Sequence, residues 1–127
     1  MSDSAPQSLI AVIDDDTAFA MSMAALLNSD GFEATLFDSA ESFLADETER
    51  SYCCLLIDWM LPGMRGTALC RHLAAQAGHP PMILMSGARI DAEVRRNQLA
   101  PEVEFMEKPF DPDWLLTEVA QRCRRHA

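Results

Sequence analysis

Short strand-like runs alternate with helical patterns along the chain, and this alternation constrains the fold more than any other feature. The runs cover Ser8–Ile13, Glu33–Phe37, Cys53–Ile57, Met82–Met85 and Val103–Met106. Two of them, Cys53–Ile57 and Met82–Met85, are apolar throughout, which is typical of strands buried on both faces. Strands that alternate with helices predict right-handed crossovers. We therefore expect an α/β fold, a doubly wound sandwich around a five-stranded parallel sheet.

The segments between the runs carry the helical signals. Phe19, Met23 and Leu27 recur every fourth residue, which places them on one stripe of a helix. Ser39 is a candidate N-cap for the next helix. The remaining helices are predicted over Thr67–Ala77, over Asp91–Leu99 and after Asp111-Pro112, an N-cap followed by an N1 proline.

Length and charge limit what this chain can do. Its 127 residues fit one domain, and we expect a flexible tail over 1–7 and the domain over 8–127. Twenty acidic residues against ten basic ones give a formal net charge of -10, which disfavours binding to nucleic acid or to an anionic membrane. The first residues do not form a signal peptide and no apolar run approaches the roughly 20 residues of a membrane span, so a cytoplasmic location is predicted.

The four cysteines, Cys53, Cys54, Cys70 and Cys123, show no spacing typical of metal chelation. In a chain without a signal peptide, such cysteines are usually reduced. We expect all four to be free thiols with a structural role.

Polar residues stand where the predicted strands end. Asp14, Asp15 and Asp16 follow the first strand, Asp58 the third, and Ser86 and Lys108 the fourth and the fifth; Lys108 is the only lysine. Because function collects at the carboxyl ends of parallel strands, these side chains should meet on one rim of the sheet.

The chemistry of that rim points to phosphoryl transfer. Two carboxylates about 5 Å apart repel by about 3 kcal/mol at an effective dielectric constant near 20, so the acids require a counterion. Mg²⁺ suits them, because it binds one or two carboxylates together with water and phosphate oxygens. Asp58 stands alone after a buried strand and is the best nucleophile, since a carboxylate can accept a phosphoryl group as an acyl phosphate.

Four segments together resemble the receiver domain of two-component response regulators, in order and in spacing: Ile13–Asp16, Ile57–Gly66, Met85–Gly87 and Glu107–Phe110. The resemblance extends over the chain from Ser8 and implies the flavodoxin-like receiver topology. It also implies that Asp58 is the phosphoacceptor. Asp14, Asp15, Asp58 and the backbone carbonyl of Met60 would then bind Mg²⁺, with Mn²⁺ as a substitute.

The resemblance assigns switching roles as well. Ser86 matches the switch hydroxyl, Lys108 the lysine that contacts the phosphoryl group, and Phe105 the aromatic switch, although Phe105 is also a plausible core aromatic. A cis Lys108-Pro109 peptide bond is implied too. On phosphorylation, the face formed by Asp91–Leu99, the fifth strand and the last helix would change shape.

The implied function is that of a phosphorelay signalling protein rather than a turnover enzyme. A histidine kinase or a phosphotransfer protein would phosphorylate Asp58, and the chain would control a downstream protein or an output domain. No helix-turn-helix follows the last helix, which leaves open a stand-alone receiver or a fragment. Residues Ser39–Leu44 are similar to receivers joined to a LuxR-type DNA-binding domain.

Three other readings remain as alternatives. A docking module with a receiver fold would not depend on phosphorylation. A phosphatase of the haloacid-dehalogenase type would need a second acid two residues after Asp58, where Met60 stands. A flavodoxin-like nucleotide binder would need a glycine- or hydroxyl-rich loop after the first strand, where Asp14–Asp16 would repel phosphate.

Overall fold

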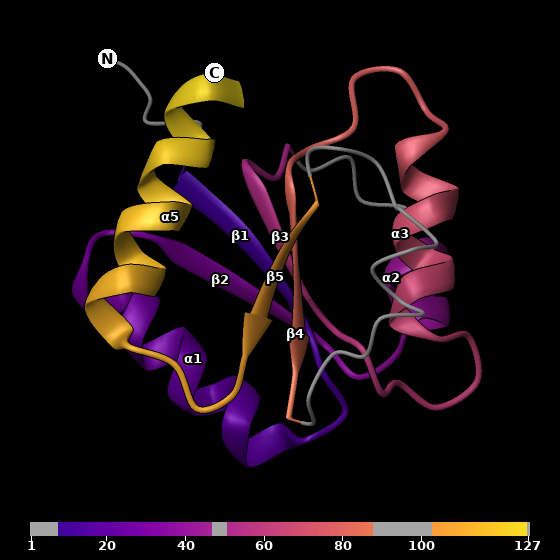
Figure 1. Ribbon diagram of the computed structural model, residues 1–127, viewed down its shortest axis with the longest axis horizontal. Helices are drawn as coiled ribbons and strands as arrows, with labels where there is room; N and C mark the ends of the chain where they lie inside the picture. Colours follow the sequence, from indigo (N-terminus) through magenta and orange to yellow (C-terminus); the bar gives the residue numbers. More distant parts are fainter. Residues whose placement is uncertain (1–7, 47–50, 88–102, 127) are drawn as a thin grey trace.

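A five-stranded parallel sheet forms the middle layer of the protein (Figure 1). The computed structural model describes residues 8–46, 51–87 and 103–126. The strands lie in the order β2-β1-β3-β4-β5, and every neighbouring pair is parallel. The predicted doubly wound sheet is therefore confirmed. The strands are β1 (Leu9–Ile13), β2 (Glu33–Phe37), β3 (Cys54–Asp58), β4 (Met82–Ser86) and β5 (Glu104–Glu107).

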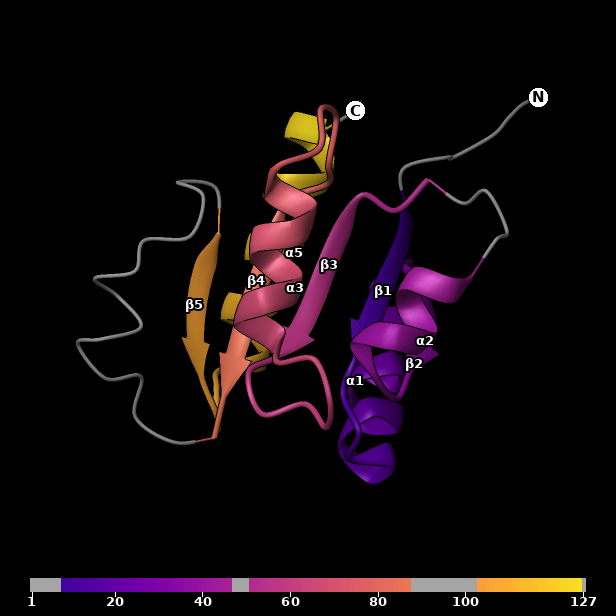
Figure 2. The same cartoon turned by 90° about the vertical axis from the view of Figure 1, so that its right-hand side faces the viewer.

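Helices cover both faces of this sheet. They are α1 (Thr17–Ser29), α2 (Ala40–Ala45), α3 (Gly66–Ala74) and α5 (Pro112–His126). Figures 1 and 2 show α1 and α5 on one face and α2 and α3 on the other. The helix predicted over Asp91–Leu99 lies outside the described residues. Within the described part of the chain, no helix is long and apolar enough to cross a membrane.

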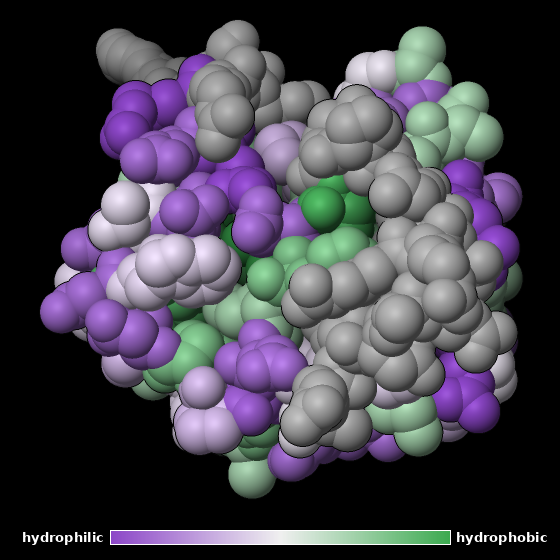
Figure 3. All heavy atoms as spheres, viewed as in Figure 1, coloured by the Kyte–Doolittle hydropathy of each residue, from purple (hydrophilic) through white to green (hydrophobic). Residues whose placement is uncertain are grey.

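The sheet separates two apolar cores. Because successive side chains of a strand point to opposite faces, Val12 and Leu56 join the core beneath α1 and α5, whereas Ile13 and Leu55 join the core beneath α2 and α3. Strands β3 and β4 are buried along their whole length, as their unbroken apolar runs predict. In Figure 3 the outer side of α5 is mostly hydrophilic, so this helix is amphipathic.

The predicted cap at Ser39 is present, and a further cap stands at the start of α1. The Asp16 carboxylate accepts the Phe19 N–H at 3.1 Å, and the Ser39 hydroxyl oxygen accepts the Ser42 N–H at 3.0 Å. Element ends differ from the predicted ones by up to three residues; the helix predicted to end at Ala77 ends at Ala74. The strand predicted to end at Ile57 includes Asp58 as its last residue.

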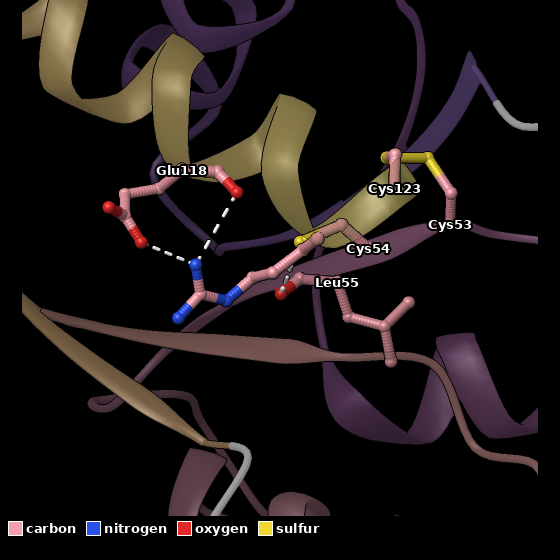
Figure 4. The surroundings of a disulfide bond; sticks show 6 residues. Cys53, Cys54, Leu55, Glu118 and Cys123 are labelled. Atoms are coloured by element: carbon pink, nitrogen blue, oxygen red, sulfur yellow. Dashed lines mark hydrogen bonds and ion pairs between the residues drawn. A yellow bond between two sulfur atoms is a disulfide. The ribbon is translucent and has the colours of Figure 1, made fainter. Parts of the chain in front are cut away.

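The prediction of four free thiols is wrong for two of them. Cys53 and Cys123 form a disulfide across 70 positions of sequence, with their Cα atoms 4.6 Å apart (Figure 4). Cys53 directly precedes β3 and Cys123 lies near the end of α5, so packing of α5 on the sheet brings them together. Cys54 and Cys70 are free thiols, as predicted, and both are buried.

Candidate phosphoacceptor site

The candidate site lies at the edge of the sheet where the strand arrows of Figure 1 point, at the bottom of the view. Asp14 directly follows β1, Asp58 ends β3, Ser86 ends β4 and Lys108 directly follows β5. The parallel pairing of the strands thus brings these residues, which are far apart in sequence, to one rim.

Three carboxylates gather at this rim. One oxygen from each of Asp14, Asp15 and Asp58 lies within 4.8 Å of the other two. Asp14 and Asp58 are only 2% and 6% exposed, whereas Asp15 faces solvent. The backbone fixes Asp14, because its N–H donates to the Phe37 carbonyl at 2.9 Å. Its Oδ1 accepts the Asp16 N–H at 2.9 Å, which leaves Oδ2 directed to another partner.

Lys108 supplies the positive charge at the centre of this cluster. Its Nζ lies 3.1 Å from Asp14 Oδ2 and 3.3 Å from Asp58 Oδ1. Its backbone N–H donates to the Ser86 carbonyl at 2.7 Å, which anchors it to the end of β4. The peptide bond between Lys108 and Pro109 is cis, as the sequence resemblance implies. A single ammonium therefore contacts the two buried carboxylates at once.

One cation does not balance this cluster. Burial raises the pKa of the Asp58 carboxyl above its usual 3.8, the negative charge of Asp14 raises it further, and the contact with Lys108 opposes both effects. A divalent cation would relieve the repulsion that remains. Carboxylates that converge within 4.8 Å are suitable ligands for Mg²⁺, so the residues present fit this ion.

The backbone of the phosphoacceptor candidate is held by close packing at the start of α3. The Gly66 N–H donates to the Trp59 carbonyl at 3.2 Å. A Cβ atom at position 66 would lie 2.2 Å from the Asp58 carbonyl oxygen, so only glycine fits there. Met60 lies in the loop between Asp58 and this glycine, with a half-exposed side chain.

That loop has a second support, from α2. Glu41 Oε2 accepts the Met64 N–H at 2.8 Å, and the same carboxylate fills the space beside Gly63. Neither this role of Glu41 nor the need for glycine at Gly66 was among the sequence predictions. Nothing in the sequence pattern indicates either contact, because both join segments whose distance depends on the folded sheet.

The two switch candidates lie on neighbouring strands. Ser86 is fully buried and pairs with Glu107 of β5. Phe105 pairs with Leu84, two residues earlier on each strand. The Phe105 ring is half-buried and packs against the core beneath α2 and α3. Phe105 therefore contributes to the core, and it borders the strand that ends at Ser86.

A further aromatic contact at the rim was not predicted. The Lys108 Nζ lies 4.0 Å from the centroid of the Phe19 ring. Phe19 also makes an edge-to-face contact with Phe110, with the centroids 6.1 Å apart. The spacing of Phe19 from Met23 and Leu27 predicts one stripe of a helix and shows nothing about Lys108.

Comparison with known proteins agrees with this architecture. A family model described as the response regulator receiver domain matches residues 10–120. The chain is 37% identical over 117 residues to the transcriptional regulatory protein FixJ of Bradyrhizobium diazoefficiens, covering 91% of this chain and 57% of that protein. It is 33% identical over 118 residues to the DNA-binding response regulator MtrA of Mycolicibacterium paratuberculosis, covering 92% and 52%.

A solved structure gives the same result. The crystal structure named FixJ-N superposes with a TM-score of 0.78 at 30% identity, covering all of this chain and 98% of that one. The chain spans between half and three fifths of the length of the two regulators. Because the family model matches most of the length of this chain, the chain belongs to the receiver domains of two-component response regulators.

Proposed function

We propose that Asp58 accepts a phosphoryl group in a Mg²⁺-dependent reaction and that this modification switches the protein between two signalling states. The observation that carries the proposal is the Lys108 ammonium, which bridges Asp14 and Asp58 within the three-carboxylate cluster. A buried acid between a cation and a metal-binding pair is suited to nucleophilic attack on phosphorus.

The proposed reaction is a direct transfer of the phosphoryl group from the donor to Asp58. A carboxylate oxygen of Asp58 forms a bond to phosphorus while the N–P bond of the donor's phosphohistidine breaks, which leaves the donor imidazole and an acyl phosphate. Lys108 would donate to a phosphoryl oxygen. Asp14, Asp15, Asp58 and the Met60 carbonyl would hold Mg²⁺, which supplies charge neutralisation for the transferred group when bound. The protein assists its own modification and is not a turnover enzyme.

Switching would begin at the two residues closest to the new charge. Phosphorylation adds about -1.5 to -2 charge at the rim. Ser86 and Lys108 would move to meet it, and Phe105 on β5 would turn inward. An ion-pair network connects that strand to the last helix: Arg122 of α5 contacts Glu104 of β5 at 3.1 Å and also Glu118. A shift of β5 would thereby reach α5.

The proposal extends to partners and setting. The donor would be a histidine kinase or a histidine phosphotransfer protein, and the receiver, taken as residues 8–127, would act in the cytoplasm. The similar proteins named as transcriptional and DNA-binding regulators support a DNA-binding output domain or a partner protein as its target. The net charge of -10 argues against contact with nucleic acid by this domain itself.

The test is the intact-protein mass after incubation with acetyl phosphate, with and without Mg²⁺. We expect one phosphoryl adduct that requires Mg²⁺ and that Asp58→Asn abolishes. Asp30→Asn is the matched control, because Asp30 is an exposed aspartate at the C-cap of α1, and it should be phosphorylated like the wild type.

Two outcomes would contradict the proposal. An adduct that persists in Asp58→Asn would place the modification elsewhere. A folded wild-type protein that forms no adduct with acetyl phosphate or with a phosphorylated histidine donor would favour the docking module.

A further inference from the structure

We infer that Phe19 is a positioning residue for phosphoryl transfer, holding the Lys108 ammonium at the rim through a cation–π contact. The inference rests on the proposed function, since it assigns an additional residue to the same site. Its basis is the 4.0 Å distance between Lys108 Nζ and the centroid of the Phe19 ring.

The contacts of the ammonium explain why the ring matters. Lys108 Nζ donates hydrogen bonds to Asp14 Oδ2 at 3.1 Å and to Asp58 Oδ1 at 3.3 Å, and the Phe19 ring lies against it as well. The Lys108 side chain is 20% exposed, so it is only partly shielded from water. A lysine has a flexible four-carbon stem, and the face of an aromatic ring limits where its cationic end can go.

The ring is itself fixed in place from two directions. The Phe19 N–H donates to the Asp16 carboxylate at 3.1 Å, which anchors the residue in the first turn of α1. Phe110 meets the ring at an interplanar angle of 90°. Phe110 follows Lys108 by two residues, so the segment that carries the lysine also supports the ring beneath it.

This arrangement affects the reaction more than the fold. If Asp58 is to be phosphorylated, the cation must stay near the transferred oxygens while its bond to the Asp58 carboxylate is exchanged for one to the phosphoryl group. The ring provides a contact that persists through that exchange, because it does not depend on either carboxylate. An aliphatic side chain at position 19 could fill the space without attracting the charge.

The experiment compares rate constants for phosphorylation by acetyl phosphate at saturating Mg²⁺, followed by intact mass. Phe19→Leu should lower the rate constant about fivefold, the size expected for loss of a partly exposed cation–π contact. Phe19→Trp, which keeps an aromatic face, should restore most of the rate. Circular dichroism verifies that each variant is folded.

Two controls separate positioning from packing. Phe32→Leu removes a phenylalanine that packs against the same core at the other end of α1, and its rate should equal that of the wild type. In a Lys108→Met background, Phe19→Leu should cause no further loss of rate, because the cation that it positions is gone. The loss of unfolding free energy caused by Phe19→Leu should be the same in both backgrounds, except for the share that the cation–π contact with Lys108 contributes in the wild-type background.

The outcomes distinguish this inference from the proposed function. A wild type that forms no adduct overturns the proposed function, and the positioning role with it. If the wild type is phosphorylated and Phe19→Leu is phosphorylated at the same rate, only the inference is overturned. Equal losses of rate with and without the Lys108 ammonium, or a slow Phe19→Trp, would assign Phe19 to packing and likewise overturn it.

Discussion

Replacing Asp58 with asparagine should make the metal-free protein more stable, although Asp58 forms an ion pair. At an effective dielectric constant near 20, two carboxylates within 4.8 Å of each other repel by at least about 3 kcal/mol, and a lysine at 3.3 Å attracts by about 5 kcal/mol. Asp15, being exposed, adds a smaller repulsion, so attraction and repulsion nearly cancel. Burial of the charge then decides the sign, and we expect Asp58→Asn to gain about 2 kcal/mol in free energy of unfolding at pH 7.

The assay is urea unfolding followed by circular dichroism, in EDTA and in Mg²⁺. At a Mg²⁺ concentration about ten times its Kd, the free energy of unfolding of the wild type should rise by about 1.4 kcal/mol, and that of Asp58→Asn by less. The difference in stability between the two proteins should therefore be smaller in Mg²⁺ than in EDTA. Asp30→Asn, at an exposed position, should stay within about 0.5 kcal/mol of the wild type in both conditions.

The pH dependence gives an independent test of the same reasoning. The pKa of Asp58 in the folded protein lies above its usual 3.8 because of burial and the charge of Asp14. Folding therefore favours the protonated Asp58 side chain. The free energy of unfolding that this preference adds is fully present below pH 3.8 and is lost as the pH rises through the raised pKa. The free energy of unfolding of the wild type should therefore fall further below that of Asp58→Asn as the pH rises. An Asp58→Asn variant that is less stable at pH 7 in EDTA would refute the reasoning, as would a difference that does not change with pH.

Three further predictions concern the rest of the molecule. Cys123→Ser should lower the free energy of unfolding by about 4 kcal/mol, since the disulfide closes a loop of 70 residues; a urea midpoint equal to that of the oxidised wild type would contradict this. Burial raises the pKa of the thiols of Cys54 and Cys70 to about 12, so at pH 9 less than about 0.1% is thiolate and iodoacetamide should label neither until urea unfolds the chain. Gly66→Ala should cost about 3 kcal/mol, because its Cβ would overlap the Asp58 carbonyl oxygen; thermal melting and Asp58 phosphorylation are the readouts, and a wild-type result in both would show that the backbone relaxes freely.

The local sequence determined the elements and the place of the site. Apolar runs such as Met82–Met85 specify strands buried on both faces, because only a sheet covered on both sides removes every side chain from water. Ser39 and Asp16 mark helix starts because their short side chains can bond the free N–H groups there. Since the strands are parallel, the polar residues that follow them must share one rim.

Only the tertiary structure decided which side chains touch. Glu41 supports the loop after β3, and Phe19 lies against Lys108, through contacts between elements whose distance follows from how the helices pack. The pairing of Cys53 with Cys123 has the same origin, and it shows why the expectation of free thiols failed for these two. Periodicity and capping depend on neighbours within a few positions of the chain, whereas these contacts depend on the relative placement of whole elements, which core packing determines.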